Sequence, residues 1–206
     1  MNLTLFDLDG TLLPMDSDHA FGDYMVRIGW ADATEHGRRN DEFYVDYLAG
    51  RLDMDAYIEF ATAAWRDRGR DEIAAMSADY MREVIGPQLR DSARALVQRH
   101  RDAGDTLVVV TATNDFITRP IAAAFGIEHL IATDLERDAS GRATGRVLGV
   151  PALREGKITR VLQWLAERRQ SFDDFGSVTF YSDSTNDLPL LEQVTHPVAT
   201  NPGPAL

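Results

Sequence analysis

Residues 2–11 read Asn2-Leu-Thr-Leu-Phe-Asp7-Leu-Asp9-Gly10-Thr11, a short apolar stretch that runs directly into two acids, a glycine and a threonine. The apolar residues predict a buried strand, and Asp9-Gly10-Thr11 predicts a turn. Two later apolar runs also end in polar residues, at 111–114 and at 182–187. Because ligands of open α/β sheets bind at the carboxyl ends of the strands, these three strand ends predict one shared site.

Helical and strand patterns alternate after Pro87. We expect helices at 91–103, 116–125, 155–168 and 188–193, and strands at 107–111, 129–133, 178–181 and 197–199. Residues 134–149, rich in Gly, Arg and Thr, suggest a hairpin on one edge. Continuous apolar strands separated by helices predict an α/β fold with a parallel sheet that is covered on both faces.

The segment 15–85 has helical periodicity and no strand signal. It contains 10 of the 18 aromatic residues, and its sixteen acids against eight arginines leave a local charge of −8. Asn40-Asp41 is expected to begin a helix that stops at Gly50, and Asp53 to begin another that stops at Gly69. The prediction is a small helical bundle inserted after the first strand. Residues 1–14 and 86–206 would then form the catalytic core, and residues 15–85 a helical cap.

Composition excludes several classes of protein. The 206 residues carry a net charge of −12, so binding to nucleic acid or to an anionic membrane surface is not expected. With no cysteine, the chain has no disulfide, zinc–thiolate site or thiol nucleophile. The N-terminus shows neither a signal peptide nor a membrane-spanning run, which predicts a soluble cytoplasmic protein.

One basic residue stands apart. Of 21 basic residues, 20 are arginine and only Lys157 is lysine. A GC-rich genome would account for the arginines, and chance could leave one lysine. The alternative is that Lys157 binds an anion in a confined site where the broad guanidinium fork does not fit.

The residue types at the three strand ends indicate phosphoryl transfer. Asp7, Asp9 and Asp183 would repel one another unless a cation lay among them, and a ligand set made only of oxygen favours Mg²⁺. Thr111 offers a hydroxyl and Lys157 an ammonium to the oxygens of a phosphate. A carboxylate can act as the nucleophile, and a second one two residues later as acid and then base.

The sequence Phe6-Asp-Leu-Asp-Gly-Thr-Leu12 resembles the first motif of the haloacid dehalogenase superfamily. Thr111, Lys157 and Asp183-Ser-Thr-Asn186-Asp187 resemble its second, third and fourth motifs, in the same order. The position of the predicted cap, with residues 111–127 (TATNDFITRPIAAAFGI), resembles the phosphoserine-phosphatase-like subfamily. This resemblance covers the whole chain and implies a Rossmann-like parallel sheet core with a helical cap.

The resemblance implies a role for each motif residue. Asp7 would be the nucleophile, and Asp9 would protonate the leaving group and then activate water. Thr111 and Lys157 would bind the phosphoryl oxygens, with Asn186 near the phosphate. The resemblance implies Mg²⁺ held by Asp7, the backbone carbonyl of Asp9, and Asp183, with Asp187 behind these ligands. Dehalogenases typically lack the second acid, so Asp9 argues against that activity.

Two positions bear on the substrate, a small phosphomonoester. Phosphoserine phosphatases have a glutamate where this chain has Asp16, and a cap arginine where a gapless match puts Ala61. Both differences weaken phosphoserine as the substrate, and Arg51 or Arg66 could take the place of the arginine only if the match is shifted. An acidic cap favours a leaving group with an amine and no carboxylate, as in histidinol phosphate, although acids on cap helices are also explained as a solvated face.

Two other functions share part of this pattern. A phosphotransferase or phosphomutase of the same superfamily would keep the aspartyl-phosphate and pass it to an acceptor. A phospho-accepting signalling domain also uses Asp and Mg²⁺ on a parallel sheet. Asp9, which speeds loss of the phosphate, and the large predicted cap argue against the signalling domain. The sequence therefore predicts a Mg²⁺-dependent phosphomonoester hydrolase.

Overall fold

The core of the computed structural model, which describes residues 1–202 and 206, is a five-stranded parallel sheet. Its strands lie in the order β3-β2-β1-β6-β7, so β1, the first in sequence, is central. The bounds are β1 (Leu3–Phe6), β2 (Thr106–Asn114), β3 (His129–Thr133), β6 (Val178–Ser182) and β7 (His196–Ala199). The predicted α/β class is confirmed, and each predicted strand is present.

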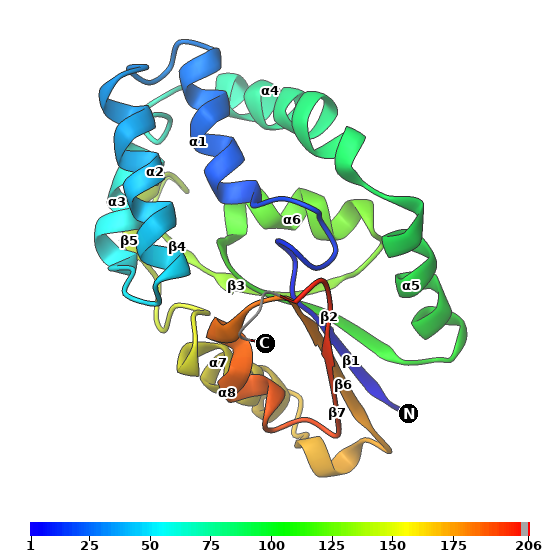
Figure 1. Ribbon diagram of the computed structural model, residues 1–206. Coiled ribbons are helices and arrows are strands. Elements are labelled where there is room, and N and C mark those ends of the chain that lie inside the picture. Colours follow the sequence, from blue (N-terminus) through cyan, green and yellow to red (C-terminus); the bar gives the residue numbers. More distant parts are fainter. Residues whose placement is uncertain (203–205) are drawn as a thin grey trace.

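Helices cover both faces of this sheet (Figure 1). Phe6 and Val109 pack with α5 (Asp91–Asp102) and α6 (Asp115–Ala124) on one face. Leu3, Leu5 and Val108 pack with α7 (Glu155–Glu167) and α8 (Leu188–Leu191) on the other. Successive strand residues point to opposite faces, so an unbroken apolar run is what a sheet buried on both sides requires.

The predicted helical cap lies beyond the carboxyl ends of the strands (Figure 1). It consists of α1 (Ser17–Arg27), α2 (Glu35–Leu48), α3 (Met54–Ala63) and α4 (Arg70–Tyr80). A π-helical turn, η1 (Met81–Ile85), continues α4, and 3₁₀ turns follow elsewhere at η2 (Gly86–Gln88), η3 (Phe172–Asp174) and η4 (Thr185–Asp187). In the described residues, no helix is both long and apolar enough to cross a bilayer. The division into core 1–14 plus 86–206 and cap 15–85 stays a prediction.

Two helix boundaries inside the cap were predicted wrongly. The helix expected to begin at Asn40-Asp41 begins at Glu35, where the Asp32 carboxylate accepts the Thr34 and Glu35 N–H groups. Asn40 is instead buried in the middle of α2 and donates to the His19 carbonyl at 2.8 Å. Asp53 caps α3 as predicted, but that helix ends at Ala63 and loose turns continue to Gly69.

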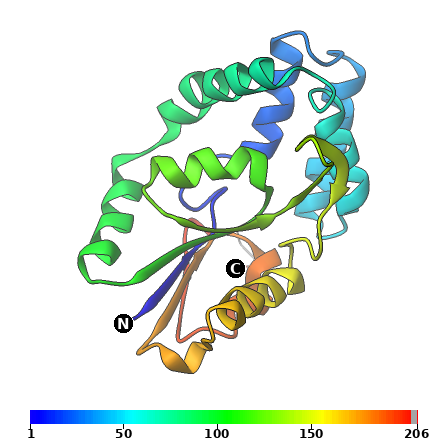
Figure 2. The same cartoon turned by 180° about the vertical axis from the view of Figure 1, so that it is seen from behind.

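The hairpin predicted at 134–149 is present as β4 (Leu135–Arg137) and β5 (Ala143–Val147). It follows the edge strand β3 but forms a two-stranded antiparallel sheet of its own. In Figure 2 it extends from the core to the side of the cap, where β5 lies against α3. The hairpin therefore links the two parts of the chain.

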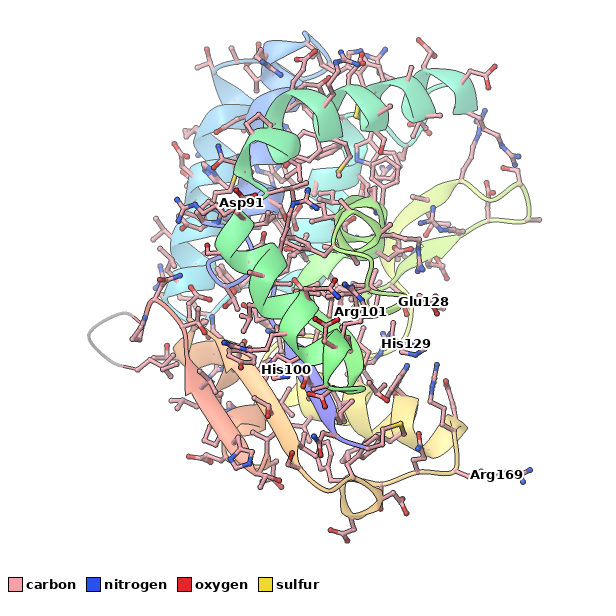
Figure 3. The ribbon with its side chains drawn as sticks, turned by 90° about the vertical axis from the view of Figure 1, so that its right-hand side faces the viewer. Asp91, His100, Arg101, Glu128, His129 and Arg169 are labelled. Carbon is pink, nitrogen blue, oxygen red and sulfur yellow. The ribbon has the colours of Figure 1, made fainter. Side chains whose placement is uncertain are left out.

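A polar network ties α5 to the central strand. His100, on the side of α5 that faces the sheet (Figure 3), contacts the Asp105 carboxylate through Nδ1 at 2.7 Å and the Tyr181 hydroxyl through Nε2 at 2.8 Å. Thr4 and Asn2 each donate to Asp105 at 3.0 Å. Burial alone would raise the pKa of Asp105, but the bonds from His100, Thr4 and Asn2 lower it below its usual value.

We expect Asp105→Ala to lower the free energy of unfolding by about 2 kcal/mol, because three donors lose their acceptor. Denaturant titration measures this, with Asp102→Ala as the matched control, since Asp102 is exposed and accepts only from Gln98.

The lowered pKa of Asp105 determines how its contribution to stability depends on pH. A carboxyl with a depressed folded pKa stabilises above its unfolded value, and this contribution is lost as the pH falls through the folded pKa. The difference in the free energy of unfolding between wild type and Asp105→Ala should therefore be largest near pH 7, and it should decrease below about pH 4. An equal difference at pH 7 and pH 2.5 would contradict this account.

Candidate active site

A buried cluster of three charges lies where β1 ends. Lys157, in the first turn of α7, donates to Asp7 Oδ1 at 2.8 Å and to Asp187 Oδ2 at 2.7 Å. The Ser182 hydroxyl also donates to Asp187 at 2.7 Å. Lys157 is only 2% exposed, Asp7 4% and Asp187 1%. The single lysine of the chain is thus a buried partner of two predicted site residues that are 180 positions apart in sequence.

The charges in this cluster do not balance. Burial by itself would lower the pKa of Lys157, but Asp187 and Asp7 raise it above its ordinary value, so the ammonium stays charged. One ammonium faces two carboxylates, and burial raises the pKa of Asp7 well above its usual range. Asp183 adds further repulsion at Asp7. The carboxylate of Asp7 is therefore short of positive charge.

Asp9 is held from two sides. Its Oδ1 accepts the backbone N–H of Ser17 at 2.7 Å, and its Oδ2 accepts the Thr113 hydroxyl at 2.8 Å. Burial, followed by the charge of Asp16, raises the pKa of Asp9 to about 7, while the bonds from Ser17 and Thr113 oppose the rise. A carboxyl of this kind can give up and take back a proton near neutral pH.

Asp183 follows β6 and lies against the turn after β1. The Thr11 hydroxyl donates to Asp183 Oδ1 at 3.2 Å. Gly10 has φ +76°, and a Cβ at this position would lie 2.1 Å from Asp183 Oδ2. The glycine is needed both for its left-handed backbone and for the approach of this carboxylate.

The end of β2 is irregular. Val110 pairs with Ile131, but four residues later Asn114 pairs with Thr133, so β2 has two extra residues here. In a regular strand, successive side chains alternate between faces. Here Thr111, Ala112 and Thr113 all line the same pocket as Asp7 and Asp9. Regular alternation would place Thr111 and Thr113 on one face and Ala112 on the other, so the irregularity accounts for all three consecutive residues lining one pocket.

The remaining predicted residues lie around this centre. Asp16 caps α1, accepting the N–H groups of Asp18 and His19 at 2.9 and 2.8 Å, and lines the pocket. Asn186, predicted near the phosphate, donates its amide to the Tyr47 carbonyl at the end of α2 at 3.1 Å. It connects the core to the cap, and its role at the phosphate stays a prediction.

The pocket lies between the sheet and the cap. The sheet side supplies Asp7, Asp9 and residues 111–113. The cap side supplies the following residues: Asp16, Asp18, His19, Asn40, Phe43, Tyr44, Tyr47, Leu52, Met54 and Tyr57. Four of the lining residues are acids, and among the described residues that line it there is no lysine or arginine.

Sequence reasoning assigned no role to Asp18. This carboxylate is 7% exposed, it accepts from Asn114 at 3.4 Å, and burial followed by the charge of Asp16 raises its pKa well above the usual value. An acid in the first turn of a helix is common as a partner of the helix dipole. Only its burial in the pocket distinguishes Asp18 from the other acids of the cap.

The donors at this centre fit a magnesium ion. The predicted set has only two side chains, Asp7 and Asp183, with the Asp9 carbonyl, and the charge of Asp183 helps to raise the pKa of Asp7. Within residues 1–202 and 206, no group of three His, Cys, Asp or Glu side chains forms a metal cluster. Mg²⁺ binds one or two carboxylates with water and substrate phosphate, so a pair that is short of positive charge suits it.

Comparison with known proteins identifies the family. A model of the haloacid dehalogenase-like hydrolases matches residues 4–192, which include every motif described above. The chain belongs to this family. The predicted superfamily is thereby confirmed.

Two relatives of this hydrolase are named as phosphatases. A histidinol-phosphatase of Neisseria meningitidis serogroup C (strain 8013) is 47% identical over 201 residues, which are 98% of this chain and 90% of that protein. The phosphoserine phosphatase SerB1 of Mycobacterium tuberculosis (strain ATCC 25618 / H37Rv) is 31% identical, over 96% of this chain and 64% of that protein. The predicted enzyme class, a phosphatase, is confirmed.

Solved structures support the same fold. The crystal structure of a protein of unknown function from Bordetella pertussis Tohama I has a TM-score of 0.92 and 49% identity, covering 99% of this chain and 92% of that one. A substrate-bound phosphoserine phosphatase complex has a TM-score of 0.69 at 15% identity, covering 99% and 88%. The second similarity is one of fold alone.

We expect Lys157→Arg to lower phosphatase activity by about a hundredfold, because a guanidinium is broader than the buried ammonium that contacts Asp7 and Asp187. Lys157→Met leaves two carboxylates buried without their cation and should cost about 3–5 kcal/mol of stability. Steady-state kinetics and denaturant titration measure the two effects. Arg168→Lys, at the exposed end of the same helix, is the control, and full activity of Lys157→Arg would contradict this account.

Proposed function

We propose that the protein is a Mg²⁺-dependent phosphomonoester hydrolase that works through an aspartyl-phosphate on Asp7. The observation that carries the proposal is the buried Asp7, which is held by Lys157 on one oxygen and lies in one pocket with Asp9. Asp7 offers a carboxylate oxygen as nucleophile, and Asp9, whose pKa is raised to about 7, offers a proton. A nucleophile with an acid two residues later is the arrangement this reaction needs.

The proposed reaction uses four side chains: Asp7, Asp9, Thr111 and Lys157. A carboxylate oxygen of Asp7 attacks phosphorus as the bond to the alcohol oxygen breaks, and Asp9 transfers its proton to that oxygen. Asp9, now ionised, takes a proton from a water that attacks the aspartyl-phosphate and releases inorganic phosphate. Thr111 and Lys157 orient and neutralise the phosphoryl oxygens throughout.

Enzymes of this family generally use Mg²⁺, and we propose that Asp7, Asp183 and the Asp9 carbonyl hold it here. The bound ion would supply positive charge to the phosphoryl oxygens as negative charge builds up on them. Asp187, which accepts from Lys157 at 2.7 Å, helps to keep the ammonium in place.

The proposed substrate is a small amino-alcohol phosphate, such as histidinol phosphate. Four carboxylates and no lysine or arginine among the described lining residues favour a leaving group that carries a cation and no carboxylate. The name of the Neisseria relative agrees with this class. Phosphoserine is disfavoured, since Ala61, at the position matched to the carboxylate-binding arginine, does not line the pocket.

Asp7→Asn should reduce phosphate release from histidinol phosphate to background while the fold stays intact, because the change removes the nucleophile and conserves shape. Phosphate release is measured with Mg²⁺, without Mg²⁺ and with EDTA, which tests the requirement for Asp7 and for the ion. Asp102→Asn, on the exposed end of α5, serves as the control. Near-normal turnover by Asp7→Asn would contradict the assignment of Asp7 as nucleophile. Full activity of the wild type in EDTA would contradict the requirement for Mg²⁺. An intact protein that releases no phosphate from any ester would instead favour a phosphotransferase that needs an acceptor.

Asp18→Asn and Asp16→Asn should each lower kcat/KM for histidinol phosphate by about tenfold, or ~1.4 kcal/mol, mainly through KM. Asparagine retains the helix cap at position 16, so the change removes charge and little else. Glycerol phosphate, which has no cation, should be hydrolysed as well as before or better. Asp23→Asn, on the same helix but outside the pocket lining, is the control. Equal losses on both substrates would contradict recognition of a cation.

A further inference from the structure

The carboxyl group of Asp9 is fixed by two elements that come from different parts of the fold. The N–H of Ser17, at the start of α1, meets Oδ1 at 2.7 Å, and the hydroxyl of Thr113, from the irregular end of β2, meets Oδ2 at 2.8 Å. Each carboxyl oxygen of Asp9 thus accepts a hydrogen bond from a different element. A carboxyl group held in this way keeps one orientation relative to Asp7.

Ser17 has a second feature that packing does not explain. Its residue is fully buried, and its hydroxyl is the one buried side-chain polar atom without a hydrogen bond in the described part of the chain. The same residue donates its backbone N–H to Asp9 Oδ1 at 2.7 Å, so this unpaired hydroxyl belongs to a residue in direct contact with Asp9. Unpaired buried hydroxyl groups are rare in folded proteins, and one beside a reacting group calls for a functional reason.

The backbone of Ser17 cannot easily move away from Asp9. The hydroxyl of Tyr80, the last residue of α4, donates to the Ser17 carbonyl at 2.6 Å. Tyr80 is itself buried and packs edge-on against Phe21 of the same helix as Ser17. The Ser17 hydroxyl is therefore kept beside Asp9 by contacts that do not involve Asp9.

Thr113 is held in a comparable way. Its N–H donates to the Thr111 hydroxyl at 3.2 Å, within the stretch where β2 leaves its regular register. The Thr113 side chain is 7% exposed and lines the pocket with Asp9. Thr113 thus connects the proton-transfer carboxyl to the predicted phosphate-binding hydroxyl.

We propose that Ser17 and Thr113 are positioning residues for Asp9, which hold its carboxyl group in line with the leaving oxygen and donate to it once it is ionised. This inference rests on the proposed function. When Asp9 gives its proton to the leaving alcohol, it becomes a carboxylate that accepts from the Thr113 hydroxyl, the Ser17 N–H and then the Ser17 hydroxyl. The proton that Asp9 regains comes from the water that attacks the aspartyl-phosphate, so no other reactant is needed.

The experiment compares two leaving groups. Departure of an alkoxide needs the proton of Asp9, whereas p-nitrophenolate leaves without one. We compare kcat/KM for histidinol phosphate with kcat/KM for p-nitrophenyl phosphate. The parameter kcat/KM is chosen because it reports only the steps up to departure of the alcohol. Thr113→Val and Ser17→Ala should each lower the value for histidinol phosphate by about tenfold or more, and leave that for p-nitrophenyl phosphate within about twofold.

Three controls separate positioning from a structural effect. Thr113→Ser retains the hydroxyl and should recover most of the loss. Ser17→Ala removes an unpaired buried hydroxyl, so its melting temperature should stay the same or rise while the activity falls. Thr62→Val removes another buried threonine hydroxyl, which donates within α3 at 2.7 Å. This variant should leave kcat/KM unchanged for both substrates.

The outcomes distinguish this inference from the proposed function. Equal losses on both substrates, or no loss on either, would overturn the positioning role and leave the phosphatase assignment standing. If only Thr113→Val acts selectively, the Ser17 part is wrong. A wild-type protein that hydrolyses neither ester in Mg²⁺ would overturn the proposed function itself.

Discussion

The ion cluster of Lys157 with Asp7 and Asp187 is the interaction on which the rest of the site depends. It joins the end of β1, the start of α7 and the turn after β6, all away from water. Burying charges is costly, and such a cluster survives only where each charge has close partners. The parallel sheet makes that possible because it brings the strand ends together at one edge. Two carboxylates on one ammonium leave the cluster short of positive charge. This deficit suits a divalent cation, whose charge would in turn attract a phosphate.

The cap contributes more than a cover over the pocket. Its first helix begins at the catalytic turn, so that Asp16 caps α1, Ser17 contacts Asp9 and Asp18 lines the pocket within three consecutive residues. One helix start thus supplies a hydrogen-bond donor to Asp9 and two acids that line the pocket. The aromatic side chains of α2 and α3 line the same pocket. In the proposed mechanism, proton transfer and selection of the leaving group would therefore depend on the same turn of backbone.

Much of the fold and many of the site residues could be predicted from sequence because their signals are local. Apolar runs predicted the five strands, and the polar residues after three of them predicted one shared edge; Asp53 marked its helix start for the same local reason. The errors arose where tertiary packing overrides local signals. Asn40 resembles a helix cap but is buried inside α2, where it donates to the His19 carbonyl. The π-helical turn at Met81–Ile85 has no sequence signature.

By itself, the sequence determined the α/β class, the order of the motifs and the candidate residues. Asp7, Asp9, Thr111 and Asp183 follow from residue types at strand ends, and Lys157 from being the single lysine of the chain. Only the tertiary structure decided that Lys157 bonds to both Asp7 and Asp187, that Asn186 reaches the cap, and that Asp18, Ser17 and Thr113 belong to the site. Composition and periodicity carry no distances. A carboxylate on a helix surface and one buried beside a nucleophile are identical in sequence, and they differ only in the solvent and charges that the folded chain places around them.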